Sequence, residues 1–209
     1  MLTKALASLI AFGITCCDAQ QNASQASSDL ENDVYAIYSL MLTNPRTSHG
    51  PDSNPRYLIQ DITAPGHPDE PCIRPPAEYQ QRFAEVLQEF GQRRNATPRT
   101  LKRALSIPKP YVLVKPDDVR RFQTRSQPEM AREPFADVLD LFTLTDVYFN
   151  KTRTLALTAI SSWCGSLCAL YQWKVFEKQA SGKWEEKPWA ACITIARSRS
   201  LVPHAPIPQ

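Results

Sequence analysis

The spacing of hydrophobic side chains changes once along the chain. Up to Phe122, apolar residues recur three and four positions apart in separate segments, which is the period of an amphipathic helix. From Leu141 onwards, apolar residues alternate with polar ones, which is the period of a strand with one buried face. The change predicts an α+β domain with helices in its first part and a sheet in its C-terminal part.

Two segments are predicted to form the main amphipathic helices. The first covers residues 29–42 and ends before Pro45, because proline disfavours helix in the residue that precedes it. The second begins near Glu78 and ends near Arg93, and both charges suit the helix dipole. The apolar stripes are Val34, Ile37, Tyr38 and Met41 in the first helix, and Tyr79, Phe83, Val86, Leu87 and Phe90 in the second. Shorter helices are expected at residues 99–105 and 116–122.

Six segments are predicted as strands, and the last four of them are joined by short turns. One turn is Asn150–Arg153, and another contains Ser181 and Gly182. Because strands joined by short turns pair antiparallel, we expect an antiparallel β-meander of four to six strands, with one face packed against the two main helices. The six segments are residues 56–63, 111–114, 141–148, 155–160, 169–175 and 189–196.

The strand at residues 169–175 indicates which of its side chains face inwards. Tyr171, Trp173 and Val175 alternate with the polar residues Gln172 and Lys174. We therefore expect Trp173 to face the core, and Gln172 and Lys174 to lie on the outer face of the sheet.

Residues 1–19 have the three parts of a secretory signal peptide. Lys4 supplies a positive charge, residues 5–14 form an apolar run, and Cys17 and Ala19 are the small residues at the predicted cleavage after Ala19. The apolar run is shorter than the about 20 residues that span a bilayer, so no transmembrane span is expected. The N-terminus thus predicts an exported protein, either secreted or periplasmic.

A lipid anchor is the alternative to simple cleavage. A bacterial lipoprotein keeps a cysteine as its first mature residue, and Cys16 and Cys17 are the two candidates. The residues before them depart from the usual small-residue pattern, which favours cleavage after Ala19. We expect the mature chain to consist of a disordered lead-in at residues 20–28, a single α+β domain at residues 29–197 and a loose C-terminal tail at residues 198–209.

Composition and charge exclude some classes of function. Hydrophobic residues make up 43% of the chain and charged residues 22%, which is close to the average of globular domains. The net charge is +3, from 24 basic and 21 acidic side chains. Because nucleic-acid binding needs basic residues clustered on one face, no nucleic-acid partner is expected.

A pattern in the C-terminal part of the chain resembles a family of exported bacterial proteins with a domain of unknown function. The pattern reads FN-x3-T-x-AL from Phe149, CG-x-LC from Cys164, EK from Glu177 and GKW from Gly182. The resemblance covers roughly half of the chain. It implies a bacterial envelope protein, and it supplies no catalytic residues.

Four cysteines follow the predicted cleavage site, namely Cys72, Cys164, Cys168 and Cys192. An even number of cysteines in an exported chain favours structural disulfides. Three pairings are possible. We prefer Cys164–Cys168 together with Cys72–Cys192, because Cys164 and Cys168 flank a glycine-containing turn.

Zinc binding and redox chemistry are the alternative uses of these cysteines. Together with His67, three of them (Cys72, Cys164 and Cys168) offer the donors of a three-cysteine, one-histidine zinc site. However, three residues separate Cys164 from Cys168 where two are commoner, and export favours oxidation, so we expect no metal and no other cofactor. A redox pair would need a helix N-terminus to lower the pKa of a thiol, whereas these cysteines lie between predicted strands.

The sequence contains none of the common catalytic signatures. Gly-x-Ser-x-Gly, His-Glu-x-x-His and the glycine patterns of nucleotide binding do not occur. His49, His67 and His204 lie in predicted loops or in the tail. Asp61 and Asp146 lie in predicted strands and are the better candidates for acid–base catalysis. A hydrolase of a cell-wall or secreted substrate, with a site built from loops, is therefore the alternative function.

Aromatic side chains gather in the predicted meander. The candidates for a binding platform are Trp163, Tyr171, Trp184 and Trp189. If they were exposed together on one sheet face, they would bind a sugar or a peptide, and packing in the core is the alternative. The function that we expect is a non-catalytic binding or structural module of the envelope, with a protein or glycan partner.

Overall fold

The computed structural model describes most of the chain. Its backbone description covers residues 7–43, 45, 55–65, 71–124, 137–165, 168–189 and 193–196, and its side-chain description covers residues 24–43, 45, 55–65, 71–123, 137–164 and 169–189. The three histidines, the side chains of Cys168 and Cys192 and the predicted tail at residues 198–209 lie outside these ranges.

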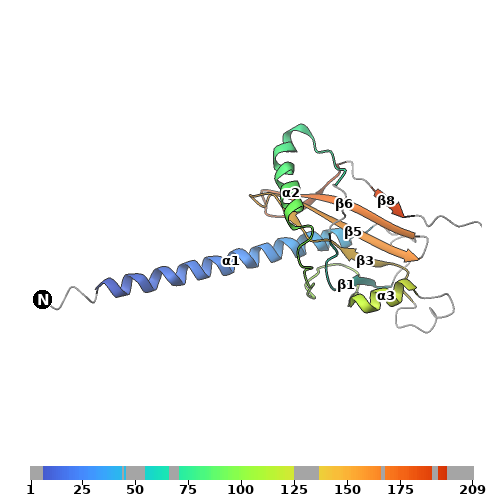
Figure 1. The fold of residues 1–209 in the computed structure, drawn as a ribbon, viewed down its shortest axis with the longest axis horizontal. Coiled ribbons are helices and arrows are strands. Elements are labelled where there is room, and N and C mark those ends of the chain that lie inside the picture. The colour runs from blue at the N-terminus through green and yellow to red at the C-terminus, as the bar shows by residue number, and fades with distance from the viewer. Residues whose placement is uncertain are drawn as a thin grey trace, which may run out of the picture.

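The first element is a long helix, α1 (Ala7–Thr43). Its C-terminal part packs into the body of the protein, and the rest extends away from it (Figure 1). Residues 20–28, the expected lead-in, belong to this helix. No glycine or proline interrupts the chain between Gly13 and Pro45, which permits a continuous helix there. Within the described residues, no helix combines the length and the apolar character needed to cross a membrane.

The other helices are η1 (Ala77–Tyr79), α2 (Gln80–Arg93) and α3 (Pro116–Thr124). The predicted stripe of α2 is confirmed, since Phe83, Val86 and Phe90 are buried. The short helix expected at residues 99–105 does not form. Instead, the amide of Leu101 donates to the carbonyl of Asp61, which holds this segment in an extended conformation along the core.

The described part of the chain forms one mixed sheet of eight strands. Six of them follow the order β2-β1-β3-β5-β6-β7, while β4 pairs with β5, and β8 pairs with β6. β1 runs parallel to β2 and to β3, and the remaining pairs are antiparallel. The strands are β1 (Tyr57–Gln60), β2 (Tyr111–Val114), β3 (Leu141–Leu144), β4 (Tyr148–Phe149), β5 (Leu155–Gly165), β6 (Cys168–Lys178), β7 (Trp184–Lys187) and β8 (Ile193–Ala196).

The predicted α+β class is confirmed, but the antiparallel meander of four to six strands is wrong in detail. β1 lies between β2 and β3, and α2 and α3 lie in the connections from β1 to β2 and from β2 to β3. Parallel neighbours need such long crossovers, whereas a meander has only short turns. The β5–β6–β7 part does keep the expected antiparallel order.

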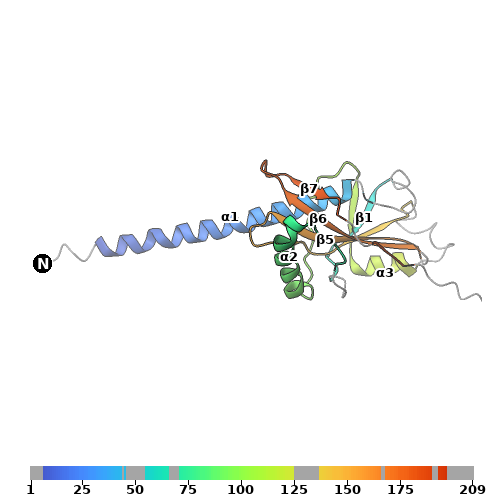
Figure 2. The same cartoon turned by 90° about the horizontal axis from the view of Figure 1, so that it is seen from above.

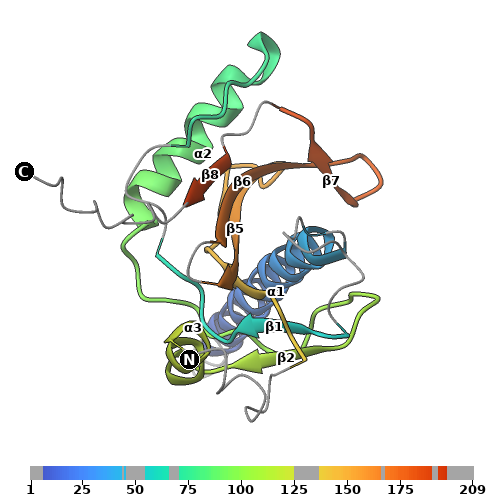
Figure 3. The same cartoon turned by 90° about the vertical axis from the view of Figure 1, so that its right-hand side faces the viewer.

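Both faces of the sheet are covered by helices. Figure 2 shows α1 on one side, with α2 and α3 on the other, and Figure 3 shows the sheet curving around α1. Alternate residues of one strand therefore enter different cores: Ile59 packs in the cluster that contains the α1 side chains, and Leu58 packs in the cluster that contains the α3 side chains.

This double coverage corrects one prediction about β6. Trp173 faces the core beside α2, as expected, with its ring centroid 5.4 Å from that of Phe90. Gln172 and Lys174, however, are only 7% and 8% exposed, on the α1 side of the sheet. Nζ of Lys174 forms an ion pair with Glu186 of β7 at 2.8 Å, which gives the enclosed charge a partner.

Candidate binding site

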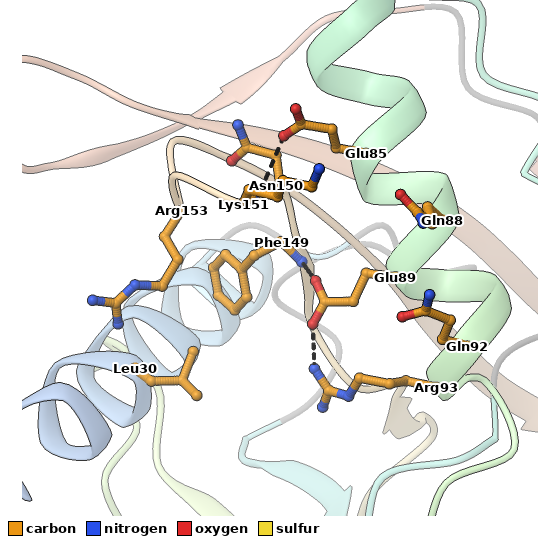
Figure 4. A pocket seen from close by; sticks show the side chains of 10 residues that line it. All are labelled: Leu30, Glu85, Gln88, Glu89, Gln92, Arg93, Phe149, Asn150, Lys151 and Arg153. Carbon is orange, nitrogen blue, oxygen red and sulfur yellow. Dashed lines mark hydrogen bonds and ion pairs between the residues drawn. The ribbon is translucent and has the colours of Figure 1, made fainter. Parts of the chain in front are cut away.

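A cavity of about 500 Å³ lies between α1, α2 and the turn that joins β4 to β5 (Figure 4). Leu30 comes from α1, and Phe149 leads into the turn. Lys151 and Arg153 belong to the turn itself. The remaining lining residues are polar, and all of them except Asn150 lie on α2. The volume lies within the range of small-molecule pockets, but eight of the ten lining residues are polar, so the cavity suits a polar ligand.

The turn on one side of the cavity is held in place by Asn150. This side chain is 3% exposed, and its Oδ1 accepts hydrogen bonds from the amides of Thr154 and Leu155 at 2.8 and 2.9 Å. Its Nδ2 donates to the hydroxyl groups of Thr152 and Thr154. These bonds explain physically why asparagine and threonine occur four residues apart in the FN-x3-T segment.

Arg153 completes the turn in an unusual backbone conformation. Its φ of 52° lies in the left-handed region, which costs a residue with a Cβ atom about 1 kcal/mol or more. Its amide donates to the carbonyl of Asn150 at 2.9 Å. Within the described part of the chain, neither its guanidinium nor the ammonium of Lys151 has an ion-pair partner. Both cations line the cavity.

The α2 wall presents one polar stripe to the cavity. It consists of Glu85, Gln88, Glu89 and Gln92, which share one face of the helix at spacings of three and four residues. Oε2 of Glu85 accepts a hydrogen bond from the amide of Lys151 at 3.1 Å, and Glu89 accepts one from the amide of Phe149. The two glutamates therefore attach α2 to the turn.

The two glutamines on this stripe, unlike the glutamates, do not bond to the turn. Gln88 and Gln92 are exposed, and their amides have no hydrogen-bond partner among the described residues. Each amide offers a donor and an acceptor. Figure 4 shows Arg153 beside Leu30 on the α1 side of the cavity, and the glutamines across from it on α2.

Asp146, one of the two predicted acid–base candidates, lies in a charged network behind the α2 wall. Its carboxylate forms ion pairs with Arg93 and, at 3.1 Å, with Nε of Arg99. It also accepts a hydrogen bond from the amide of Val147 at 3.0 Å. Arg93 in turn bonds Oε1 of Glu89 at 2.5 Å, so the network fixes the position of the cavity wall.

Two buried tyrosines adjoin this network. Burial, followed by the charge of Asp146, raises the pKa of Tyr148 to about 12. The same two causes raise the pKa of Tyr38, whose hydroxyl donates to the carbonyl of Thr145 at 2.8 Å. Both phenols are therefore neutral at physiological pH and stabilise the packing of the two helices on the sheet.

Asp61, the other predicted acid–base candidate, follows β1 and does not line the cavity. Its amide donates to the carbonyl of Val114 at 2.8 Å, and its own carbonyl accepts from Leu101 at 2.7 Å. Its backbone thus connects β1, β2 and the segment after α2. One carboxylate oxygen, Oδ1, is buried without a hydrogen-bond partner within the described residues.

The four predicted aromatic binding residues are divided among three hydrophobic clusters. Trp163 packs on Phe122 of α3, with ring centroids 5.3 Å apart. Trp189 packs on Tyr79 and Tyr171 packs on Trp173, all on the α2 side. Trp184 is 6% exposed on the α1 side. None of the four lines the cavity, and the structure does not bring them together into one platform.

The structure describes the side chains of two of the four predicted disulfide cysteines. Cys72 and Cys164 are disulfide-bonded. The side chains of Cys168 and Cys192 lie outside the described residues, so the pairing Cys164–Cys168 with Cys72–Cys192 stays a prediction. In the part of the chain that the structure describes, no group of three His, Cys, Asp or Glu side chains is arranged to hold a metal ion. His67 of the alternative zinc site is outside that part.

Sequence reasoning missed the cavity because no motif marks it. The turn Asn150–Arg153 was predicted, and the polar stripe of α2 follows from the same period as its apolar stripe. The backbone conformation of Arg153 and the place of Leu30 depend on tertiary contacts. Comparisons of the chain with protein-family models, curated proteins and solved structures find no match. The resemblance to exported bacterial proteins therefore stays a prediction.

Proposed function

We propose that the protein is an exported, non-catalytic binding module of the bacterial envelope, which holds a polar ligand in the cavity between α1, α2 and the β4–β5 turn. The observation that carries the proposal is that some polar side chains of the cavity are bonded within the protein, whereas others are not. Glu85, Glu89 and Arg93 are occupied by bonds within the protein. Gln88, Gln92 and the two cations of the turn have no such bond among the described residues and are free to contact a ligand.

Two features support the exported location in this proposal, and both are independent of the cavity. The signal-peptide pattern of residues 1–19 and the disulfide-bonded Cys72 and Cys164 both agree with an oxidising compartment outside the cytoplasm. The charged network on Asp146 favours binding over catalysis, because this carboxylate is committed to two arginines that position the cavity wall.

A binding assay on envelope material tests this function. The full chain is exported from a bacterial host, purified, and sedimented with washed envelope from the same host. Changing both Gln88→Ala and Gln92→Ala should lower the bound fraction several-fold, because the lost amides no longer pair with the ligand. The matched control is Gln123→Ala, since Gln123 is an exposed glutamine on α3. Equal binding by the double variant and the control would contradict the proposal.

A further inference from the structure

We propose that the cavity takes a saccharide that carries a carboxylate group, and that Arg153 selects the negative charge. This inference rests on the proposed function and names the ligand class for the same site. It depends on three features of the lining, namely two cations without an ion-pair partner among the described residues, the backbone of Arg153 and the two glutamine amides.

The cations of the turn favour an anionic group on the ligand. Arg93, the third cation of the lining, is already bonded to Glu89 and Asp146. Arg153 and Lys151 have no such partner in the described chain, and the planar guanidinium of arginine matches a carboxylate with two parallel hydrogen bonds. Glu85 stands on the α2 side beside the amide of Lys151, so a negative group is better placed near Arg153 on the α1 side.

The backbone of Arg153 points to a role for its side chain. At a φ of 52°, glycine would avoid the steric cost that arginine incurs. The guanidinium gains no ion pair within the described residues that would offset this cost inside the protein. A left-handed residue closes many hairpin loops, and strained non-glycine residues are enriched at active sites and ligand clamps.

The rest of the lining favours a sugar over a peptide. Gln88 and Gln92 are one helical turn apart, and their amides each supply a donor and an acceptor, which suits neighbouring hydroxyl groups. Leu30, which is partly buried, gives a small apolar surface for the C–H face of a sugar ring, whereas Phe149 is 5% exposed and packs mainly in the core. Peptides are bound along a free sheet edge, in an apolar groove or, when acidic, by a cluster of arginines. This cavity instead has a polar helix face and one arginine, Arg153, without an ion-pair partner in the described residues.

Calorimetric titration with three short probes tests the ligand class. The probes are a tetrasaccharide of galacturonic acid, the same tetrasaccharide with every carboxylate methyl-esterified, and tetraglutamate. We expect the acidic saccharide to bind most tightly, with an affinity that falls as salt is added. Arg153→Gln should weaken this binding about tenfold, and Arg153→Lys should weaken it less. Lys183→Gln is the matched control, because Lys183 is an exposed cation in another turn.

The outcomes separate this inference from the proposed function. Equal affinity for the acidic and esterified saccharides, or unchanged binding by Arg153→Gln, overturns the role of the charge. Tighter binding of tetraglutamate overturns the saccharide class. If no probe binds while Gln88 and Gln92 still control retention on the envelope, the inference fails and the proposed function stands. If that retention is also independent of the glutamines, both fail. Thermal melting of each variant shows that it is folded.

Discussion

The carboxylate of Asp33 on α1 is bonded to Nζ of Lys178 on β6 at 2.7 Å, across 145 positions of sequence. The same carboxylate accepts a hydrogen bond from the indole of Trp184 at 2.9 Å. Asp33 is 7% exposed, and Trp184 is 6% exposed. These contacts attach the C-terminal part of α1 to the β6–β7 edge of the sheet.

The first prediction concerns this attachment. Asp33→Ala should lower the free energy of unfolding by about 2 kcal/mol or more, because it leaves the Lys178 ammonium and the Trp184 N–H without their acceptor. Urea unfolding, followed by tryptophan fluorescence, measures the change. Glu31→Ala is the control, since its ion pair with Lys102 is exposed and should matter little. Equal losses in the two variants would show that the Asp33 contacts are not specific.

The second prediction concerns the turn beside the cavity. Asn150→Ala removes two acceptor and two donor contacts from a buried side chain, so it should destabilise the protein by about 2–3 kcal/mol. Asn150→Asp keeps the acceptor oxygen and loses the amide donor, so this variant should lose less stability than Asn150→Ala. Thermal unfolding of both variants tests the order. If the alanine and aspartate variants unfold at the same temperature as the wild type, the turn does not depend on Asn150.

The third prediction separates stability from binding at Arg153. Arg153→Gly removes the Cβ atom from a left-handed position, so the free energy of unfolding should rise by up to about 1 kcal/mol. Retention on envelope material should fall in the same variant, because the guanidinium is lost. Chemical unfolding and the sedimentation assay are therefore run on one preparation. A less stable glycine variant would mean that the arginine side chain supports the fold.

The fourth prediction concerns acid sensitivity at Glu177. Burial alone would raise the pKa of this carboxyl group, but hydrogen bonds from Lys187, Arg82 and Tyr79 outweigh burial and lower the pKa. A carboxyl group whose pKa is lower in the folded state stabilises the fold above its unfolded pKa. That contribution is lost as the pH falls from about 4.5 through the folded pKa.

Substitution by glutamine isolates this contribution. Glu177→Gln should be less stable than the wild type at neutral pH, and the difference should shrink as the medium becomes acidic. Unfolding midpoints measured between pH 7 and about pH 3 show the trend. Asp29→Asn is the control, since Asp29 is an exposed acidic residue on α1. A difference between Glu177→Gln and the wild type that is constant with pH would contradict the lowered pKa.

Local periodicity determined several features of the protein from sequence alone. The buried stripe of α2, the end of α1 before Pro45, the β4–β5 turn and the inward position of Trp173 all follow from residues within a few positions of one another. The α+β class follows from the same local signals, since the change of period separates most of the helical segments from most of the strands.

Only the tertiary structure decided the rest, because pairing and coverage are long-range. The place of β1 between two parallel neighbours depends on crossovers that no strand encodes within itself. Gln172 and Lys174 are buried on the same face of β6 as Phe176, whose cluster contains the α1 side chains, although their alternation with Trp173 is also what an exposed face would show. The candidate site has the same origin: Leu30, Gln88 and Arg153 line one cavity only because α1, α2 and a β-turn meet in space.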